Sequence, residues 1–193
     1  EIYPDFLLDL VAIGTVADMV SLTDENRIFV KQGIELLNED PRIGIKMLLE
    51  LSNITTNIDE QTIGFYIAPK LNSIGRMDSA KVGLSFLMAE DASVAKSLAE
   101  QIEEYNVQRK EVTENIVKDV IETIENSDIK NKSVIMVSGD YHEGVLGIVA
   151  SNIVEKYQRP VLIMNNKEGV LKGSARSVFD FNIYTAINKI GDK

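Results

Sequence analysis

The spacing of apolar residues divides the chain into three regions. In the first region they recur at steps of three and four, which predicts a helix beginning near Thr23 or Asp24 and shorter helices around 44–51, 59–68 and 80–88. This part of the chain is therefore predicted to be mainly helical.

A nearly continuous apolar run covers residues 7–13, close to the start of the chain. It predicts a buried strand, and residues 14–20 then form the turn that follows it. Asp18 would lie near the carboxyl end of that strand, where ligands collect in open α/β sheets, although a turn or cap residue is the ordinary alternative. Because such a strand needs partners that the chain does not offer, we expect the chain to be a piece of a longer protein.

The second region has the clearest helical pattern. From Val94 to Ile124 an apolar stripe advances in steps of three or four, and Arg109 occupies one of the expected apolar places. Arg109 is either a salt-bridged residue that covers its own stem or a cation turned toward a cleft between domains. A helix of about 35 residues would be about 50 Å long, which suits a connection between two domains.

The third region, after Ser127, changes its period and predicts an α/β domain with the order βαββα. The expected strands are 134–138, 160–164 and 170–175, with a turn at 165–169, and the expected helices are 144–157 and one from about Phe181.

Composition narrows the possible classes of protein. The 193 residues are 45% hydrophobic, yet no apolar stretch approaches the roughly 20 residues of a membrane-spanning helix. With no cysteine, a disulfide framework and thiolate metal sites are excluded, and an intracellular, cytoplasmic location is favoured. The net charge of −10 argues against non-specific coating of nucleic acid, but residues 90–128 carry −7 of it, so the net charge does not exclude local basic clefts.

The first candidate ligand site is the segment that contains Asn72, Ser73, Gly75 and Arg76. At the end of a predicted helix it offers an amide, a hydroxyl, backbone N–H groups beside glycine and a forked cation, a set that suits a phosphate. The alternative is a helix C-cap at Gly75 with a surface arginine.

The second candidate site combines two segments of the α/β region. His142, the only histidine, lies where a strand ends and a helix begins, which suits a phosphate contact. Ser174 and Arg176 are flanked by small residues, as in a loop that admits a phosphate. The alternatives are a packed loop histidine and alternate positions on an ordinary strand.

Four motifs in order along the chain resemble those of the RecJ family of single-stranded-DNA-specific exonucleases, which are DHH phosphoesterases. Residues 9–20 resemble the last motif of the catalytic DHH domain, and 71–76 resemble the phosphate-gripping motif. Residues 142–147 and 173–177 resemble the beginning of the DHHA1 domain.

The resemblance implies an α/β fold with three parts. Residues 1–89 correspond to the C-terminal portion of the DHH domain, 90–127 to a linker helix and 128–193 to the first part of DHHA1. It also implies nucleic-acid contacts by the following residues: Asn72, Ser73, Gly75, Arg76, Asn106, Arg109, His142, Ser174 and Arg176. Tyr141 stands where the family commonly has tryptophan, a departure that implies an aromatic surface with weaker base stacking.

The chemistry implied by the resemblance is hydrolysis of single-stranded DNA from a 5′ end in repair and recombination, with two Mn²⁺ or Mg²⁺ ions. Asp18 matches one catalytic, metal-binding aspartate, whereas the family's other metal-ligand motifs are absent from this sequence. We therefore expect the isolated chain to be inactive. The alternatives are a phosphodiesterase for short oligonucleotides or cyclic dinucleotides and a non-catalytic replication scaffold.

Overall fold

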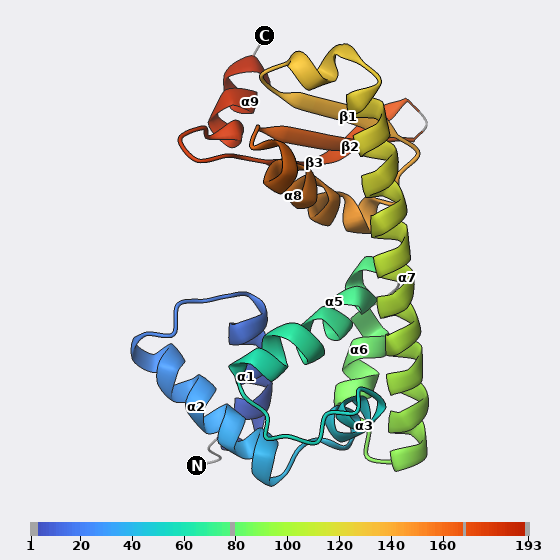
Figure 1. Ribbon diagram of the computed structural model, residues 1–193. Helices are drawn as coiled ribbons and strands as arrows, with labels where there is room; N and C mark the ends of the chain where they lie inside the picture. Colours follow the sequence, from blue (N-terminus) through green and yellow to red (C-terminus); the bar gives the residue numbers. More distant parts are fainter. Residues whose placement is uncertain (1–3, 78–79, 168, 192–193) are drawn as a thin grey trace. The chain divides into compact units, whose positions relative to one another are not determined.

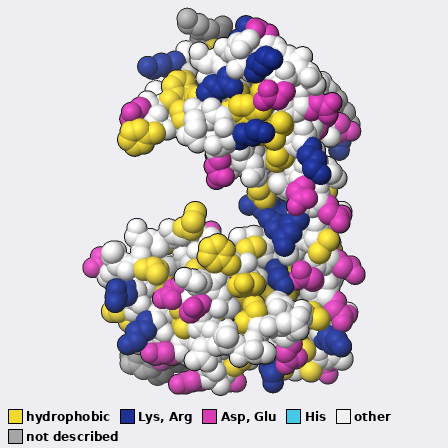
Figure 2. All heavy atoms as spheres, viewed as in Figure 1, with side chains coloured by type: hydrophobic (Ala, Val, Ile, Leu, Met, Phe, Trp, Pro, Cys, Tyr) yellow, Lys and Arg dark blue, Asp and Glu magenta, His cyan; other side chains and the backbone are white. Residues whose placement is uncertain are grey.

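The computed structural model describes residues 4–77, 80–167 and 169–191, and the chain divides into two compact units (Figure 1). The first unit is Glu1–Val107 and the second is Gln108–Lys193. On the face seen in Figure 2, both acidic and basic side chains lie at the surface of each unit. Among the helices that the structure describes, none combines the length and the apolarity needed to cross a membrane.

The first unit is helical, as predicted. Its elements are η1 (Pro4–Leu7), α1 (Leu8–Ala17), α2 (Asp24–Glu39), α3 (Ile43–Leu51), α4 (Glu60–Thr62), the π-helical turn η2 (Ile63–Ile67), α5 (Ala68–Met77), α6 (Ala80–Leu87) and the first part of α7 (Ala92–Glu125). Its core contains the buried side chains of Leu37, Ile63, Ile67, Phe86 and Ile102. These residues come from helices throughout the unit, so one core holds the helices together.

The strand predicted for residues 7–13 is wrong, because this segment forms the end of η1 and most of the helix α1. The run is apolar on nearly every side, so its pattern does not distinguish a buried strand from a buried helix. Asp18 consequently follows the last turn of a helix and does not lie at the edge of a sheet.

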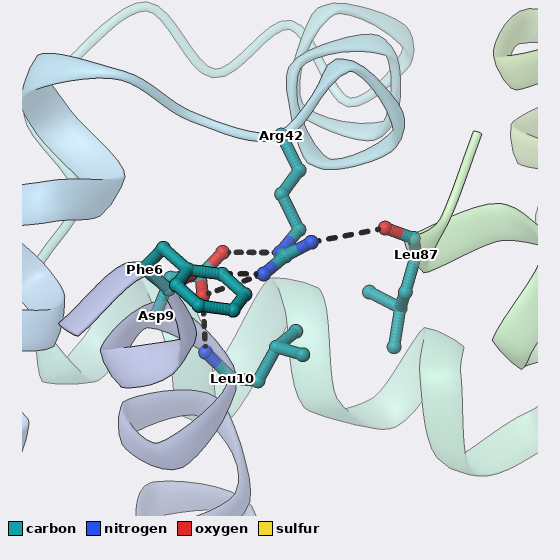
Figure 3. A network of polar contacts seen from close by, with 5 residues as sticks. All are labelled: Phe6, Asp9, Leu10, Arg42 and Leu87. Atoms are coloured by element: carbon teal, nitrogen blue, oxygen red, sulfur yellow. Dashed lines mark hydrogen bonds and ion pairs between the residues drawn. The ribbon is translucent and has the colours of Figure 1, made fainter. Parts of the chain in front are cut away.

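A buried ion pair fixes the start of α1 (Figure 3). Arg42, just before α3, donates from Nε to Asp9 Oδ2 at 2.5 Å and from Nη2 to Asp9 Oδ1 at 3.2 Å. The same guanidinium donates to the carbonyl oxygens of Phe6 at 3.0 Å and Leu87 at 3.5 Å. One arginine thus connects the beginning of the chain, the α2–α3 connection and the end of α6.

The second unit has the predicted βαββα order. After the rest of α7 come η3 (Asp128–Asn131), β1 (Ile135–Gly139), η4 (Glu143–Val145), α8 (Leu146–Tyr157), β2 (Val161–Lys167), β3 (Val170–Arg176) and α9 (Ile183–Gly191). The sheet order is β1-β2-β3, with β1 parallel to β2 and β2 antiparallel to β3. Strand β2 runs on to Lys167, so the turn is shorter than predicted, and residue 168 lies outside the described residues.

One face of this sheet is buried. Alternate residues of β1 and β2, Ile135, Val137, Val161 and Ile163, share a core with residues of α7 and α8. Figure 1 shows α8 lying across the sheet. Residues paired across two strands lie on the same face of a sheet. Ser174 and Arg176 of β3 pair with the buried Ile163 and Val161 of β2, so their side chains lie on the face that α8 covers.

The long helix predicted between the two regions is confirmed as α7, which has 34 residues. The division between the two units falls inside α7, after Val107.

Candidate nucleic-acid interface

The segment with Asn72, Gly75 and Arg76 lies within helix α5, so the prediction of a loop after a helix is wrong here. A glycine inside a helix costs only about 1 kcal/mol relative to alanine, and Gly75 therefore does not end the helix. Asn72 and Gly75 are exposed and Arg76 is partly exposed. Ser73 is fully buried and donates to the carbonyl oxygen of Lys70 at 2.6 Å, so its hydroxyl faces the core instead of a ligand.

A polar network behind α5 sets the orientation of this helix. Lys70 is only 8% exposed, yet its ammonium group pairs with Glu103 of α7 and donates to Ser52 Oγ at 2.7 Å. A buried ammonium requires such partners, because burial without them costs several kcal/mol. With Lys70 held on the inner face, Asn72 is left on the outer face of α5.

Asn106 belongs to the same network. Its side chain is 2% exposed, and its Nδ2 lies 3.4 Å from Glu103 Oε1, to which it donates. A nucleic acid does not reach an amide in this position, so the predicted substrate contact by Asn106 disagrees with its burial. The network was missed from the sequence because Lys70 and Glu103 look like ordinary surface charges on separate helices.

Arg109, the exception in the apolar stripe, lies partly buried on α7 in the second unit. Its carbonyl oxygen accepts a hydrogen bond from Thr113 Oγ1 at 2.7 Å. Partial burial agrees with a cation whose stem covers apolar surface.

Asp18 is exposed at the C-cap of α1, where its backbone N–H donates to the carbonyl oxygen of Gly14 at 3.0 Å. An exposed carboxylate can serve as one metal ligand. The described part of the chain contains no group of three or more acidic or histidine side chains placed to hold a metal ion. These residues therefore do not form a complete two-ion site.

Ser174 and Arg176 come together with α8. Arg176 Nε donates to Ser151 Oγ at 3.1 Å, and Nη1 donates to the carbonyl oxygen of Ala175 at 3.0 Å. Gly147, one turn before Ser151, leaves the space that these side chains occupy: a Cβ at this position would lie 2.9 Å from Arg176 Nη2 and 3.6 Å from Ser174 Oγ. The result is a hydroxyl and a guanidinium held side by side against a glycine of a helix.

We expect Gly147→Ala to displace the Arg176 guanidinium while leaving the fold intact. The added methyl group meets the far end of a flexible side chain, which can move, and alanine favours the helix by about 1 kcal/mol. The melting temperature should therefore stay the same or rise, while any anion affinity that depends on Arg176 falls. Thermal unfolding and anion binding measured on the same preparation check both parts; a lower melting temperature with unchanged binding would contradict this expectation.

His142 is exposed and lies at the start of η4, where its Nδ1 accepts a hydrogen bond from the N–H of Gly144 at 3.2 Å. The next residue, Glu143, accepts from Asn165 Nδ2 at 3.4 Å and lies 3.9 Å from Lys172 Nζ. Together with Glu143 and Asn165, His142 lines a hollow of about 440 Å³ beside the ends of β1 and β2. No hydrogen bond among the described residues joins it to Ser174 or Arg176.

The predicted stacking surface at Tyr141 is wrong, because this side chain is 8% exposed and packs in the core. Its hydroxyl donates to Asp119 Oδ2 on α7 at 2.5 Å, and burial together with this carboxylate raises the pKa of Tyr141 far above its ordinary value. Tyr141 therefore remains a neutral donor and ties the loop that carries His142 to α7.

Comparisons with known proteins give consistent results. No family model matches the chain. The single-stranded-DNA-specific exonuclease RecJ of Bacillus subtilis is 37% identical over 98% of this chain, which covers 24% of that protein. RecJ of Escherichia coli is 36% identical over 95% of this chain, which covers 33% of that protein. The crystal structure of Thermus thermophilus RecJ in complex with Mg²⁺ matches 98% of this chain and 29% of that chain, with 28% identity and a TM-score of 0.86.

The resemblance and the α/β fold predicted from the sequence are thereby confirmed. The chain spans between about a quarter and a third of the length of these relatives.

Proposed function

We infer that this chain, a RecJ homologue over almost its whole length, is a substrate-holding part of a metal-dependent exonuclease that degrades single-stranded DNA. The observation that carries the proposal is the 37% identity over 98% of the chain to a single-stranded-DNA-specific exonuclease. We assign residues 1–89 to the C-terminal portion of the DHH domain, 90–127 to the linker helix and 128–193 to the first part of DHHA1.

The exposed chemistry of the two units fits this role. Asn72 and Arg76 on α5, and Ser174 and Arg176 on β3, each combine a neutral polar group with a guanidinium. A guanidinium forms bidentate hydrogen bonds to phosphate oxygens, and such contacts do not depend on the base sequence. The two pairs would hold phosphates of the DNA backbone, and His142 would add a donor at the edge of the sheet.

Magnesium and manganese occur in the solved structures of RecJ from Thermus thermophilus. We propose that the complete protein also uses Mn²⁺ or Mg²⁺, with Asp18 as one ligand. Such ions would activate water and stabilise charge on the phosphodiester. Because the described residues do not form a complete site, the remaining ligands would come from elsewhere in the protein. Since its proposed substrate is single-stranded DNA, we assign the complete protein to DNA repair and recombination. We also assign it to the cytoplasm.

The experiment that tests this proposal is Arg176→Ala in the full-length protein that carries this chain. Losing one phosphate contact should weaken binding of a single strand about equally for all base sequences, and reduce the slope of log K against log salt by about 0.7. Binding measured by fluorescence anisotropy at several salt concentrations gives both quantities. Arg27→Ala, which replaces an arginine on α2 outside both pairs, is the matched control.

Unchanged affinity and salt slope in Arg176→Ala would contradict the assignment of this residue. Degradation assays with the full-length protein test the activity itself. Faster cleavage of dinucleotides or cyclic dinucleotides than of long strands would favour the phosphodiesterase alternative, and no metal-dependent cleavage of either would favour the scaffold.

A further inference from the structure

We propose that Phe65 and Tyr66 form an aromatic platform on which a base of the single strand stacks, next to the backbone contacts of Asn72 and Arg76. This inference rests on the proposed function and adds to it a second kind of contact, one made to the bases instead of the phosphates.

The backbone of η2 presents both aromatic side chains to the surface. Ile63 and Ile67, at the two ends of this turn, are fully buried, whereas Phe65 is 76% exposed and Tyr66 is 51% exposed. Two adjacent aromatic residues are therefore held on a rigid turn whose ends are anchored in the core. Such π-helical turns are rare and occur frequently at functional sites.

The platform lies on the same side of the helix as the proposed backbone contacts. Along η2 and α5, exposed or partly exposed positions recur at 65/66, 69, 72 and 75/76, and buried positions recur at 63, 67, 70 and 74. From the aromatic pair to Arg76 this outer stripe extends for about 15 Å. Figure 2 shows apolar side chains over the first part of this stretch and basic side chains near the end of α5.

The platform also lies beside the end of α1. A Cβ at Gly64 would be 3.8 Å from Val16 Cγ1, so η2 packs against the turn of α1 that precedes Asp18. The aromatic pair is therefore on a turn that packs beside the helix whose end carries the proposed metal ligand.

A nucleic-acid base is the occupant that fits this combination of side chains. Bases of every sequence stack on aromatic faces, and each stacked base contributes a substantial part of single-strand affinity. An amide and a guanidinium on the same stripe match the phosphates that follow such a base. A purely apolar partner would cover the aromatic pair but would gain nothing from Asn72 or Arg76.

The test compares protein variants with modified DNA in the full-length protein. Phe65→Ala should raise the Kd for an unmodified single strand about 5-fold to 100-fold. A series of strands, each with a single abasic site at a different position, should contain one strand whose Kd for the wild-type protein is raised by a similar factor. At that position the two changes should not add, because each removes one side of the same contact. Phe65→Trp should retain the Kd, and Phe65→Leu should raise it as Phe65→Ala does. Leu84→Ala, which truncates an exposed apolar residue on α6, should change the Kd little.

Equal weakening of intact and abasic strands by Phe65→Ala at every position would overturn the inference, since the side chain would then act through the fold. A lower melting temperature with unchanged Kd would overturn it too, because it would show that another part of the protein covers the pair. Arg76→Ala separates the two proposals. If Arg76→Ala and Arg176→Ala weaken binding while Phe65→Ala does not, only the platform fails; if none of the three changes binding, the proposed function fails as well.

Discussion

Replacement of Arg42 by methionine is expected to destabilise the first unit by about 3 to 5 kcal/mol. The substitution keeps most of the side-chain volume but removes the guanidinium that accompanies the buried Asp9 carboxylate. It also leaves two backbone carbonyl groups, of Phe6 and Leu87, without this donor. Because a small unit is stable by only about 5 to 15 kcal/mol, this loss would be a large fraction of the total.

Urea unfolding of the 193-residue chain measures this effect. The control is Lys31→Met, which removes an exposed pair with Glu35 on α2 and should change stability by less than about 1 kcal/mol. The double variant Asp9→Leu/Arg42→Met should recover much of the loss, because it removes the uncompensated charge. An Arg42→Met variant as stable as the control would show that Asp9 is adequately solvated without its partner.

The sequence predicted best those elements whose periodicity has only one structural interpretation. The stripe of α7 continues for 34 residues, which no strand can match, and the βαββα order follows from short β-branched runs on either side of an amphipathic helix. In both cases local pattern and tertiary packing favour the same structure. The boundaries differ by one to a few residues, as at the end of β2, where the strand continues through two asparagines.

Two local predictions failed for identifiable reasons. Residues 7–13 are apolar except for Asp9, so their pattern fits a buried helix as well as a buried strand, and Arg42, the partner that holds Asp9, lies 33 residues away. The segment around Gly75 was predicted to be a loop after a helix, with a helix C-cap at Gly75 as the alternative, although the apolar positions continue through Ile74 in the period of α5. A glycine at an exposed helical position is tolerated when the buried face on the other side is well packed.

The exposed candidate residues could be predicted from the sequence, but the buried residues that orient them could not. Lys70 and Glu103 hold α5 from behind, as Tyr141 and Asp119 hold the loop that carries His142. Each pair joins segments far apart in the sequence, and its members resemble ordinary surface residues until their burial is known. Chemistry-bearing motifs are local, whereas the contacts that give them a fixed geometry are not.

The close packing of α1 on α2 leads to the second large expected effect. Gly33 in α2 faces α1, and a Cβ there would overlap the carbonyl oxygen of Leu8 and lie 2.5 Å from Ala12 Cβ. These are backbone and short side-chain atoms, which cannot move aside unless the two helices separate. We therefore expect Gly33→Ala to destabilise the first unit by about 3 kcal/mol, at the upper end of the usual cost of overpacking.

Helix propensity acts in the opposite direction, and the matched variant Gly14→Ala separates the two effects. Alanine is favoured over glycine inside a helix by about 1 kcal/mol, which is too little to offset the clash at Gly33. At Gly14, an exposed position in α1, a Cβ would have no described atom within 4 Å, so the propensity gain should appear alone. Urea unfolding should then show one variant less stable and the other more stable than the parent chain. If both variants gained stability, α1 and α2 would not pack as closely at Gly33 as the structure shows.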